Sequence, residues 1–240
     1  MINSICDCLL QLLFLTPFVV LARRGNENLK TGTLILASLV FIATSVPTDL
    51  LSHISILEGQ GWNWGGKTIS LIIALIFIFS YKPIAPRQFG LTTKIETKNA
   101  RPILLICTGY SLIRLILYLT MTKEAGTFHI EAILYQATMP GIVEEVIFRG
   151  ILLRLLNQAF VNPKWIFANV TFGWAAIITS LLFGLTHSTY FDNNYHIHFD
   201  FLNILRLTFD GFLFALLVEK TKSLIPSILF HNILNLIGNH

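Results

Sequence analysis

The stretch MPGIVEEVIFRGILLRLL, residues 139–156, is largely apolar, yet it carries the adjacent carboxylates of Glu144 and Glu145 and the guanidinium of Arg149. Its length approaches the roughly 20 residues that a helix needs to cross the hydrocarbon core of a bilayer. A carboxylate in the middle of such a helix costs about 2.5–3.5 kcal/mol on insertion scales. Two neighbouring carboxylates therefore indicate partners or a function inside the protein.

The composition of the rest of the chain is that of a membrane protein. Hydrophobic residues make up 54% of the 240 residues and charged residues only 12%, and the mean hydropathy is +0.67. A soluble domain carries about 25% charged residues, so the composition excludes a soluble domain with a single anchor. The net charge of +4 does not indicate a nucleic-acid partner, because the basic residues lie between apolar runs, where charge sets membrane orientation.

Eight apolar segments are expected to be helices, which predicts an all-α, polytopic transmembrane helix bundle in the cell membrane. Backbone groups in lipid must be satisfied within helices or closed barrels, and an unbroken apolar run such as 69–79 does not alternate like a barrel strand. The predicted segments are roughly 5–22, 32–48, 67–81, 102–121, 138–156, 170–188, 201–218 and 223–238.

Lys and Arg residues cluster in alternate connections between these segments. The connections 23–30, 82–101, 157–169 and 219–222 are basic, whereas the intervening connections carry almost no Lys or Arg. The positive-inside rule then places the four basic connections in the cytoplasm and both chain termini outside.

The charged residues of the fifth segment divide into a pair and a single carboxylate. Glu145 and Arg149 are four residues apart, so they share a helix face and can form an ion pair. Helix geometry rotates Glu144 about 100° away from Glu145. Glu144 is therefore expected to point at a different partner.

Two later segments supply further polar groups. The sixth ends in FGLTHS, where Phe183 and His187 share a helix face, and the eighth places His231 and Asn235 four residues apart. The simpler interpretation is that such groups join helices, at about 0.6 kcal/mol each. In the predicted orientation, however, Glu144, His187 and His231 reach similar depths in the outer half of the membrane, which favours one shared acid–base site.

Three patterns thus follow one another in the late segments, EExxxR, FxxxH and HxxxN, formed by Glu144, Glu145, Arg149, Phe183, His187, His231 and Asn235. In this order they resemble the CPBP family, which contains the CAAX prenyl proteases and the bacteriocin-processing or immunity (Abi) proteins. The stretch RQFGL, 87–91, is similar to a turn that often precedes the core of that family. The resemblance places a catalytic core at about 138–238 within a bundle spanning 102–240, and leaves 1–101 as N-terminal helices and a cytoplasmic loop.

The resemblance implies an intramembrane endopeptidase that hydrolyses a peptide bond in a membrane-associated peptide or C-terminal tail, either CAAX-like or bacteriocin-like. It implies that Glu144 is the general base and that His187 binds and polarises the attacking water. His231 and Asn235 would donate hydrogen bonds to the oxyanion. The implied supporting residues are Glu145, Arg149 and Phe183.

Alternatives remain open for the cofactor and for the function. Glu144, His187 and His231 could instead be three ligands of Zn²⁺ with an open position for water. No cofactor is favoured, because the Asn235 amide suits an oxyanion hole better than a zinc shell. A non-catalytic bacteriocin immunity or binding protein would use the same cavity, and a transporter would also contain charged groups in the membrane. The expected partners are a peptide or protein substrate within the membrane and the lipid bilayer itself.

Overall fold

The helices of the bundle follow the predicted apolar segments. The computed structural model describes residues 2–24, 26, 29–51, 62–121, 130–192 and 194–238. Eight long helical segments are found there, one of which is the unbroken run α6–η2–α7: α1 (Ile2–Arg23), α2 (Thr31–Leu50), α3 (Trp64–Ser80), α4 (Arg101–Met121), α6 (Met139–Glu145), η2 (Val146–Leu152), α7 (Leu153–Ala159), α8 (Trp174–Ser188), α9 (Phe201–Thr221) and α10 (Ile225–Gly238). The predicted all-α class is confirmed.

Four of these helices are long and apolar enough to cross a membrane, within the described part of the chain: α1, α2, α4 and α9. The helices α3, α8 and α10 are apolar but shorter. Large apolar side chains face outward along α4, where Leu105 is 61% exposed and Leu119 is 66% exposed. Such surfaces are stable only against lipid or another apolar partner, which agrees with a membrane protein.

Short elements that were not predicted join the long helices. They are η1 (Pro86–Phe89), α5 (Ile130–Gln136), β1 (Lys164–Phe167), β2 (Val170–Gly173), β3 (Thr189–Phe191) and β4 (Ile197–Phe199). The strands form two antiparallel hairpins, β1–β2 and β3–β4. The helix predicted to begin at residue 170 therefore begins at Trp174, because Ala168 and Asn169 take positive φ and turn the chain back so that β2 pairs with β1.

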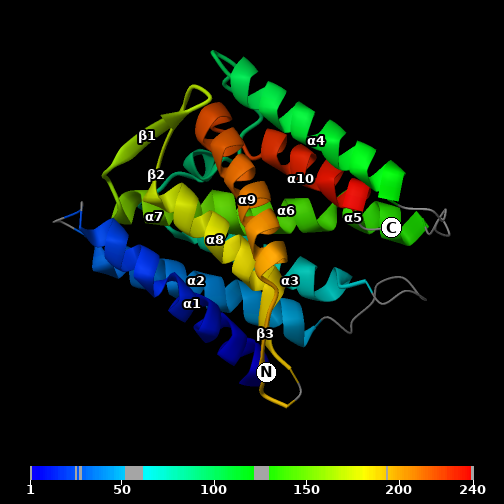
Figure 1. Ribbon diagram of the computed structural model, residues 1–240. Helices are drawn as coiled ribbons and strands as arrows, with labels where there is room; N and C mark the ends of the chain where they lie inside the picture. Colours follow the sequence, from blue (N-terminus) through cyan, green and yellow to red (C-terminus); the bar gives the residue numbers. More distant parts are fainter. Residues whose placement is uncertain are drawn as a thin grey trace.

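The helices are arranged around the α6–η2–α7 run. The helices α1 and α2 lie along one edge, α4 and α10 lie along the other, and α8 and α9 cross between them (Figure 1). The run contacts α3 and α10 through α6, and α2 and α8 through α7. A helix surrounded in this way can carry charged groups away from lipid, which suits the unusual residues of this segment.

A glycine sets the closest approach between α8 and α9. A Cβ atom at Gly184 would lie 2.4 Å from Thr208 Oγ1 and 2.6 Å from the carbonyl oxygen of Ile204. Small residues allow helix backbones to approach closely within membranes. The position of α8, and with it the position of His187 one turn further on, depends on this contact.

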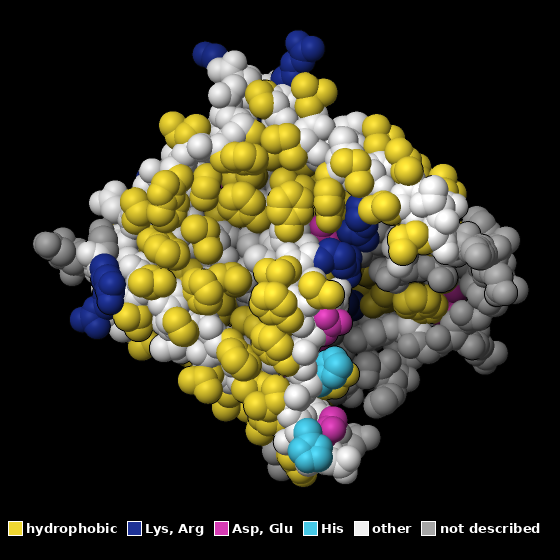
Figure 2. All heavy atoms as spheres, in the orientation of Figure 1, with side chains coloured by type: hydrophobic (Ala, Val, Ile, Leu, Met, Phe, Trp, Pro, Cys, Tyr) yellow, Lys and Arg dark blue, Asp and Glu magenta, His cyan; other side chains and the backbone are white. Residues whose placement is uncertain are grey.

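The four basic connections meet at one end of the bundle. Asn26 Oδ1 accepts hydrogen bonds from the backbone N–H groups of Val161, at 2.7 Å, and Asn162, at 2.9 Å. The N–H of Leu224 donates to the carbonyl of Gly90 at 3.1 Å. Figure 2 shows some Lys and Arg side chains at the top and left margins of the broad apolar face and another group of them within its outline, beside Asp and Glu side chains. The basic side chains of this end are Arg23, Arg24, Lys30, Lys82, Arg87, Lys94, Lys98, Arg101, Arg154, Lys164, Lys220 and Lys222.

The substitution Gly184→Ala is expected to destabilise the protein by about 1–3 kcal/mol, because overpacking a tight contact forces backbone shifts. The matched control is Gly109→Ala in α4, where an added Cβ meets nothing within 4 Å. Alanine is favoured over glycine in helices, so the control should be neutral or slightly stabilising. Thermal unfolding in detergent measures both variants, and equal behaviour would contradict the tight α8–α9 contact.

Candidate active site

Glu144 meets both predicted histidines inside the bundle. Its Oε2 atom lies 3.5 Å from Nε2 of His187 and 3.7 Å from Nε2 of His231. The three side chains come from α6, α8 and α10. Glu144 is buried, and its Oε2 has no hydrogen-bond partner within the described residues. The structure thus brings together the three residues that the sequence placed at similar depth.

Glu145 points to the other side of His231. Its Oε1 accepts a hydrogen bond from Arg149 Nη1 at 3.1 Å and lies 2.9 Å from Nδ1 of His231. Its Oε2 accepts from the hydroxyl of Ser227. The predicted ion pair is confirmed, and the helical rotation between the two glutamates places one carboxylate at each nitrogen of the same imidazole ring.

Arg149 is completely buried and contacts two neighbouring helices, α8 and α9. Its Nη2 donates to the carbonyl of Gly211 on α9 at 3.0 Å. The guanidinium lies over the rings of Phe183, at 4.5 Å, and Phe214, at 5.1 Å. A guanidinium disperses its charge over such aromatic faces. Phe183 in turn packs against His187, with ring centroids 4.6 Å apart.

Hydrogen-bond partners determine which nitrogen of each histidine carries a hydrogen. Nδ1 of His187 lies 2.8 Å from the carbonyl oxygen of Phe183, which can only accept. Nδ1 of His231 faces the Glu145 carboxylate, which also accepts. Each Nδ1 is therefore the donor, and Nε2 of each neutral ring presents a lone pair toward Glu144.

The two asparagines of α10 have different surroundings. Asn235 is half-buried and lines a pocket of about 480 Å³ together with Glu144, His187 and His231. Asn232 is buried, and its Oδ1 accepts from the backbone N–H of Gly141 at 3.0 Å, which joins α10 to α6. Asn235 thus faces the open space, as its shared face with His231 predicts, while Asn232 is used for packing.

A lysine at the site was missed by the sequence analysis. The Nζ atom of Lys67 forms an ion pair with Oε1 of Glu144. The apolar segment was predicted to begin at residue 67, but α3 begins at Trp64 and turns Lys67 inward from its first turn. The available signal was a lysine at the edge of a connection that carries no other Lys or Arg.

The site is reached from two pockets. The pocket of about 480 Å³ is also lined by Arg114, Arg206 and Asp210. A second pocket of about 450 Å³ shares Glu144, His187 and Lys67 with the first and extends toward Asp7, Asp49 and Asn63. Glu144 therefore lies between two polar spaces, where a water and an extended peptide could both reach it.

The donor set fits a divalent cation poorly. Within the described residues, no group of three or more His, Cys, Asp and Glu side chains is arranged to hold a metal ion. The ammonium of Lys67 contacts the Glu144 carboxylate and would repel a cation placed beside it. The absence of a cofactor stays a prediction.

Comparison with known families supports the resemblance seen in the motifs. Residues 126–237 match the family model described as type II CAAX prenyl endopeptidase Rce1-like. The matched range covers all three motifs and nearly coincides with the predicted core, 138–238. No curated protein and no solved structure matches the chain. The division of the chain at residue 101 stays a prediction.

Replacing Arg149 by Met is expected to cost about 3–5 kcal/mol of stability, because it leaves the Glu145 carboxylate buried without its cation. The control is Arg206→Met, which removes an exposed partner of Asp210; Arg206 is 44% exposed and Asp210 keeps Arg114. Exposed pairs are worth about 0–1 kcal/mol. Denaturant unfolding in detergent compares the two, and similar losses would contradict the structural role assigned to Arg149.

Proposed function

Residues 126–237 match the Rce1-like type II CAAX prenyl endopeptidase family, and on this premise we propose that the chain is a multi-pass intramembrane endopeptidase of the cell membrane. It hydrolyses a peptide bond with a water activated by Glu144. The observation that carries the proposal is the buried Oε2 of Glu144, which lacks a hydrogen-bond partner in the described structure and faces two imidazole nitrogens.

Glu144 is proposed as the general base. Lys67 occupies its Oε1, which leaves Oε2 to accept a proton from water. The Nε2 lone pair of His187 accepts the second hydrogen of that water and orients its oxygen toward the scissile carbonyl carbon. As the tetrahedral intermediate collapses, Glu144 returns the proton to the leaving amine, so the same group serves as base and then as acid.

Asn235 and His231 are proposed as donors to the oxyanion. The Asn235 amide can donate in any protonation state of the site. His231 already uses Nδ1 toward Glu145, so it can donate from Nε2 only when both ring nitrogens carry hydrogen. Donors held in place before reaction act most strongly where water is excluded.

Glu145, Arg149 and Phe183 are proposed as positioning residues. Glu145 orients His231, and Arg149 compensates the charge of Glu145. Phe183 packs between the Arg149 guanidinium and the His187 ring and supplies the carbonyl that orients His187. In this proposal, none of the three side chains contacts the scissile bond directly.

The proposed substrate is a membrane-associated peptide or C-terminal tail, either CAAX-like or bacteriocin-like. Apart from the paired Lys67 and Glu144, the pocket beside Glu144 is lined by the cations Arg114 and Arg206 and by the carboxylate of Asp210. Such an excess of positive charge suits the terminal carboxylate of a tail. A peptide entering there would pass Glu144 with its final residues in this pocket.

The positions of the Lys and Arg residues indicate which side of the membrane the site faces. The basic connections lie at one end of the bundle, while the pocket of about 450 Å³ beside Glu144 extends toward Asn63, Asp7 and Tyr190. The positive-inside rule then directs the site away from the cytoplasm. CAAX proteases act on prenylated tails at the cytosolic face, so this orientation favours a peptide presented from the outer side.

Labelling of single cysteines in intact cells tests this orientation. In a Cys6→Ser background, Tyr195→Cys at the β3–β4 hairpin is expected to react with an impermeant maleimide, because Tyr195 is 69% exposed at the end opposite the basic connections. Lys98→Cys, in a basic connection, should react only after the cells are opened. The reverse pattern would place the site on the cytoplasmic side.

The substitution Glu144→Gln is expected to reduce peptide cleavage by about 10²–10⁴-fold while leaving insertion intact, because it removes the base and keeps the shape. Asn235→Ala should cost about 10²–10³ through the lost oxyanion donor. The measurement is cleavage of a farnesylated CAAX peptide and of an unprenylated apolar peptide by purified protein in liposomes. The matched control is Glu131→Gln, because Glu131 is also buried but accepts from Trp64 Nε1 at 3.1 Å outside the site.

The same assay separates the alternatives. Full activity in Glu144→Gln would remove Glu144 as the base. Activity unchanged by a strong chelator is expected, whereas loss restored by added Zn²⁺ would support the metal-dependent alternative. Wild-type protein that captures a bacteriocin-like peptide but cleaves neither probe would support the immunity or binding alternative.

A further inference from the structure

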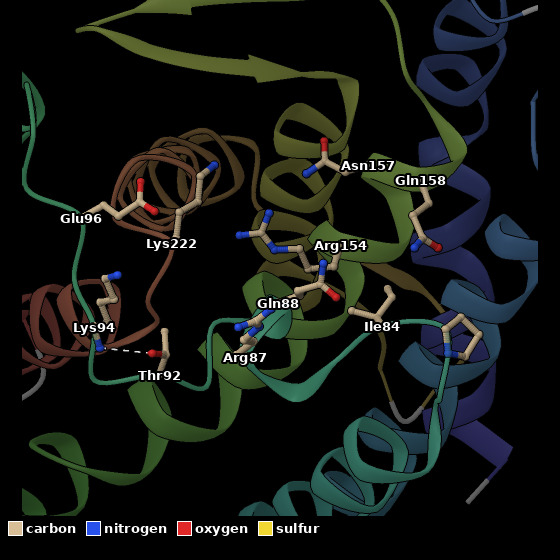
Figure 3. A pocket seen from close by; sticks show the side chains of 11 residues that line it. Ile84, Arg87, Gln88, Thr92, Lys94, Glu96, Arg154, Asn157, Gln158 and Lys222 are labelled. Atoms are coloured by element: carbon tan, nitrogen blue, oxygen red, sulfur yellow. Dashed lines mark hydrogen bonds between the residues drawn. The ribbon is translucent and has the colours of Figure 1, made fainter.

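A third polar pocket lies at the basic end of the bundle, remote from Glu144. Its volume is about 520 Å³. It is formed by η1, by the extended stretch that follows it, by α7 and by the residue after α9 (Figure 3). None of its lining residues belongs to the pockets beside Glu144. The pocket therefore needs an explanation of its own.

Four cationic side chains from four separate segments converge on this pocket. Arg87 comes from η1, Lys94 from the extended stretch, Arg154 from α7 and Lys222 from the end of α9. Glu96 is the acidic side chain that lines the pocket with them. Cations brought together in this way repel one another unless an anion compensates them, and one lining carboxylate is too few for four.

The carboxylate behind the pocket is already shared. Glu219 Oε2 lies 3.6 Å from Arg154 Nη1 and 3.3 Å from Lys222 Nζ, and Glu219 Oε1 accepts from Asn157 Nδ2 at 2.6 Å. Glu219 thus holds Arg154 and Lys222 at the pocket without neutralising both.

The remaining donors have no acceptor in the described part of the chain. Neither Arg87 nor Lys94 forms an ion pair there, although the backbone N–H of Lys94 donates to Thr92 Oγ1 at 3.1 Å (Figure 3). Arg154 Nε is buried and has no hydrogen-bond partner among the described residues. Burying a donor of this kind is costly unless an acceptor reaches it. The pocket therefore offers charged donors to an anion with several oxygen atoms.

We propose that this pocket binds the phosphate group of an anionic membrane lipid. Guanidinium groups match phosphate oxygens in geometry, and lysines add point charges. The apolar side chains of Pro83 and Ile84 line the same pocket and would face the glycerol and the first acyl carbons. The pocket lies at the end that the positive-inside rule assigns to the cytoplasmic leaflet, where basic pockets between helices bind anionic headgroups.

Native mass spectrometry of the full-length protein in neutral detergent tests the proposal. The probes are phosphatidylglycerol, phosphatidylcholine and inorganic phosphate, each titrated separately. We expect one phosphatidylglycerol to bind at least about tenfold more tightly than phosphatidylcholine. The double variant Arg87→Gln/Lys94→Gln should weaken that binding about 25-fold, or about fivefold for each charge. It removes cations that hold no carboxylate in the described structure, so the fold should persist.

The matched control is Arg24→Gln/Lys98→Gln, which removes two exposed charges from the same end but outside the pocket. It should change phosphatidylglycerol binding by less than about twofold. Equal binding of phosphatidylglycerol and phosphatidylcholine, or equal losses of phosphatidylglycerol affinity in the two double variants, would overturn the proposal that this pocket binds an anionic lipid. Inorganic phosphate that displaces the lipid at equal concentration would overturn the lipid assignment in favour of a soluble ligand. No outcome depends on peptide cleavage, so the result is separate from the endopeptidase proposal.

Discussion

The buried ion pair between Glu145 and Arg149 is the constraint on which the rest of the structure depends. Both side chains are completely buried. The chain around them is largely apolar, with 54% hydrophobic residues. A lone charge at this place would be strongly unfavourable, so each member requires the other. The pair also fixes three further helices, because Arg149 binds the Gly211 carbonyl on α9 and lies over Phe183 of α8, while Glu145 binds α10 through Ser227. The rotation of each of these helices about its axis follows from the pair.

The position of Glu144 is a consequence of the same constraint. Because Glu145 is committed to Arg149, the adjacent residue must face a different side of the run, toward α3. There it meets Lys67, which lies outside the range 126–237 matched by the family model. The early helices therefore contribute a charge to the site and do more than surround the core. An ammonium on one carboxylate oxygen and imidazoles near the other make Glu144 asymmetric, which suits a base that uses a single oxygen.

The cations of the four basic connections lie at one end of the bundle, and none of them lines the pockets beside Glu144. The end with the basic connections holds the pocket lined by Arg87, Lys94, Arg154 and Lys222. The pocket of about 450 Å³ beside Glu144 extends toward the other end, where Asp7 accepts a hydrogen bond from the backbone N–H of Phe191. In the proposed orientation, these cations face the cytoplasmic leaflet, where the proposed lipid pocket also lies, and the proposed hydrolytic site lies away from them.

The sequence by itself determined the helical class and the pairing of Glu145 with Arg149, because apolar length and a spacing of four residues act within one helix. It also indicated that Glu144 faces elsewhere. Only the tertiary structure decided which atoms meet: Nε2 of His187 and of His231 beside one oxygen of Glu144, and Lys67 on the other. The hairpin β1–β2 was likewise missed, since strand pairing joins residues that no helical period relates. Contacts between helices depend on rotation, tilt and depth, and these are set by packing among all the segments together.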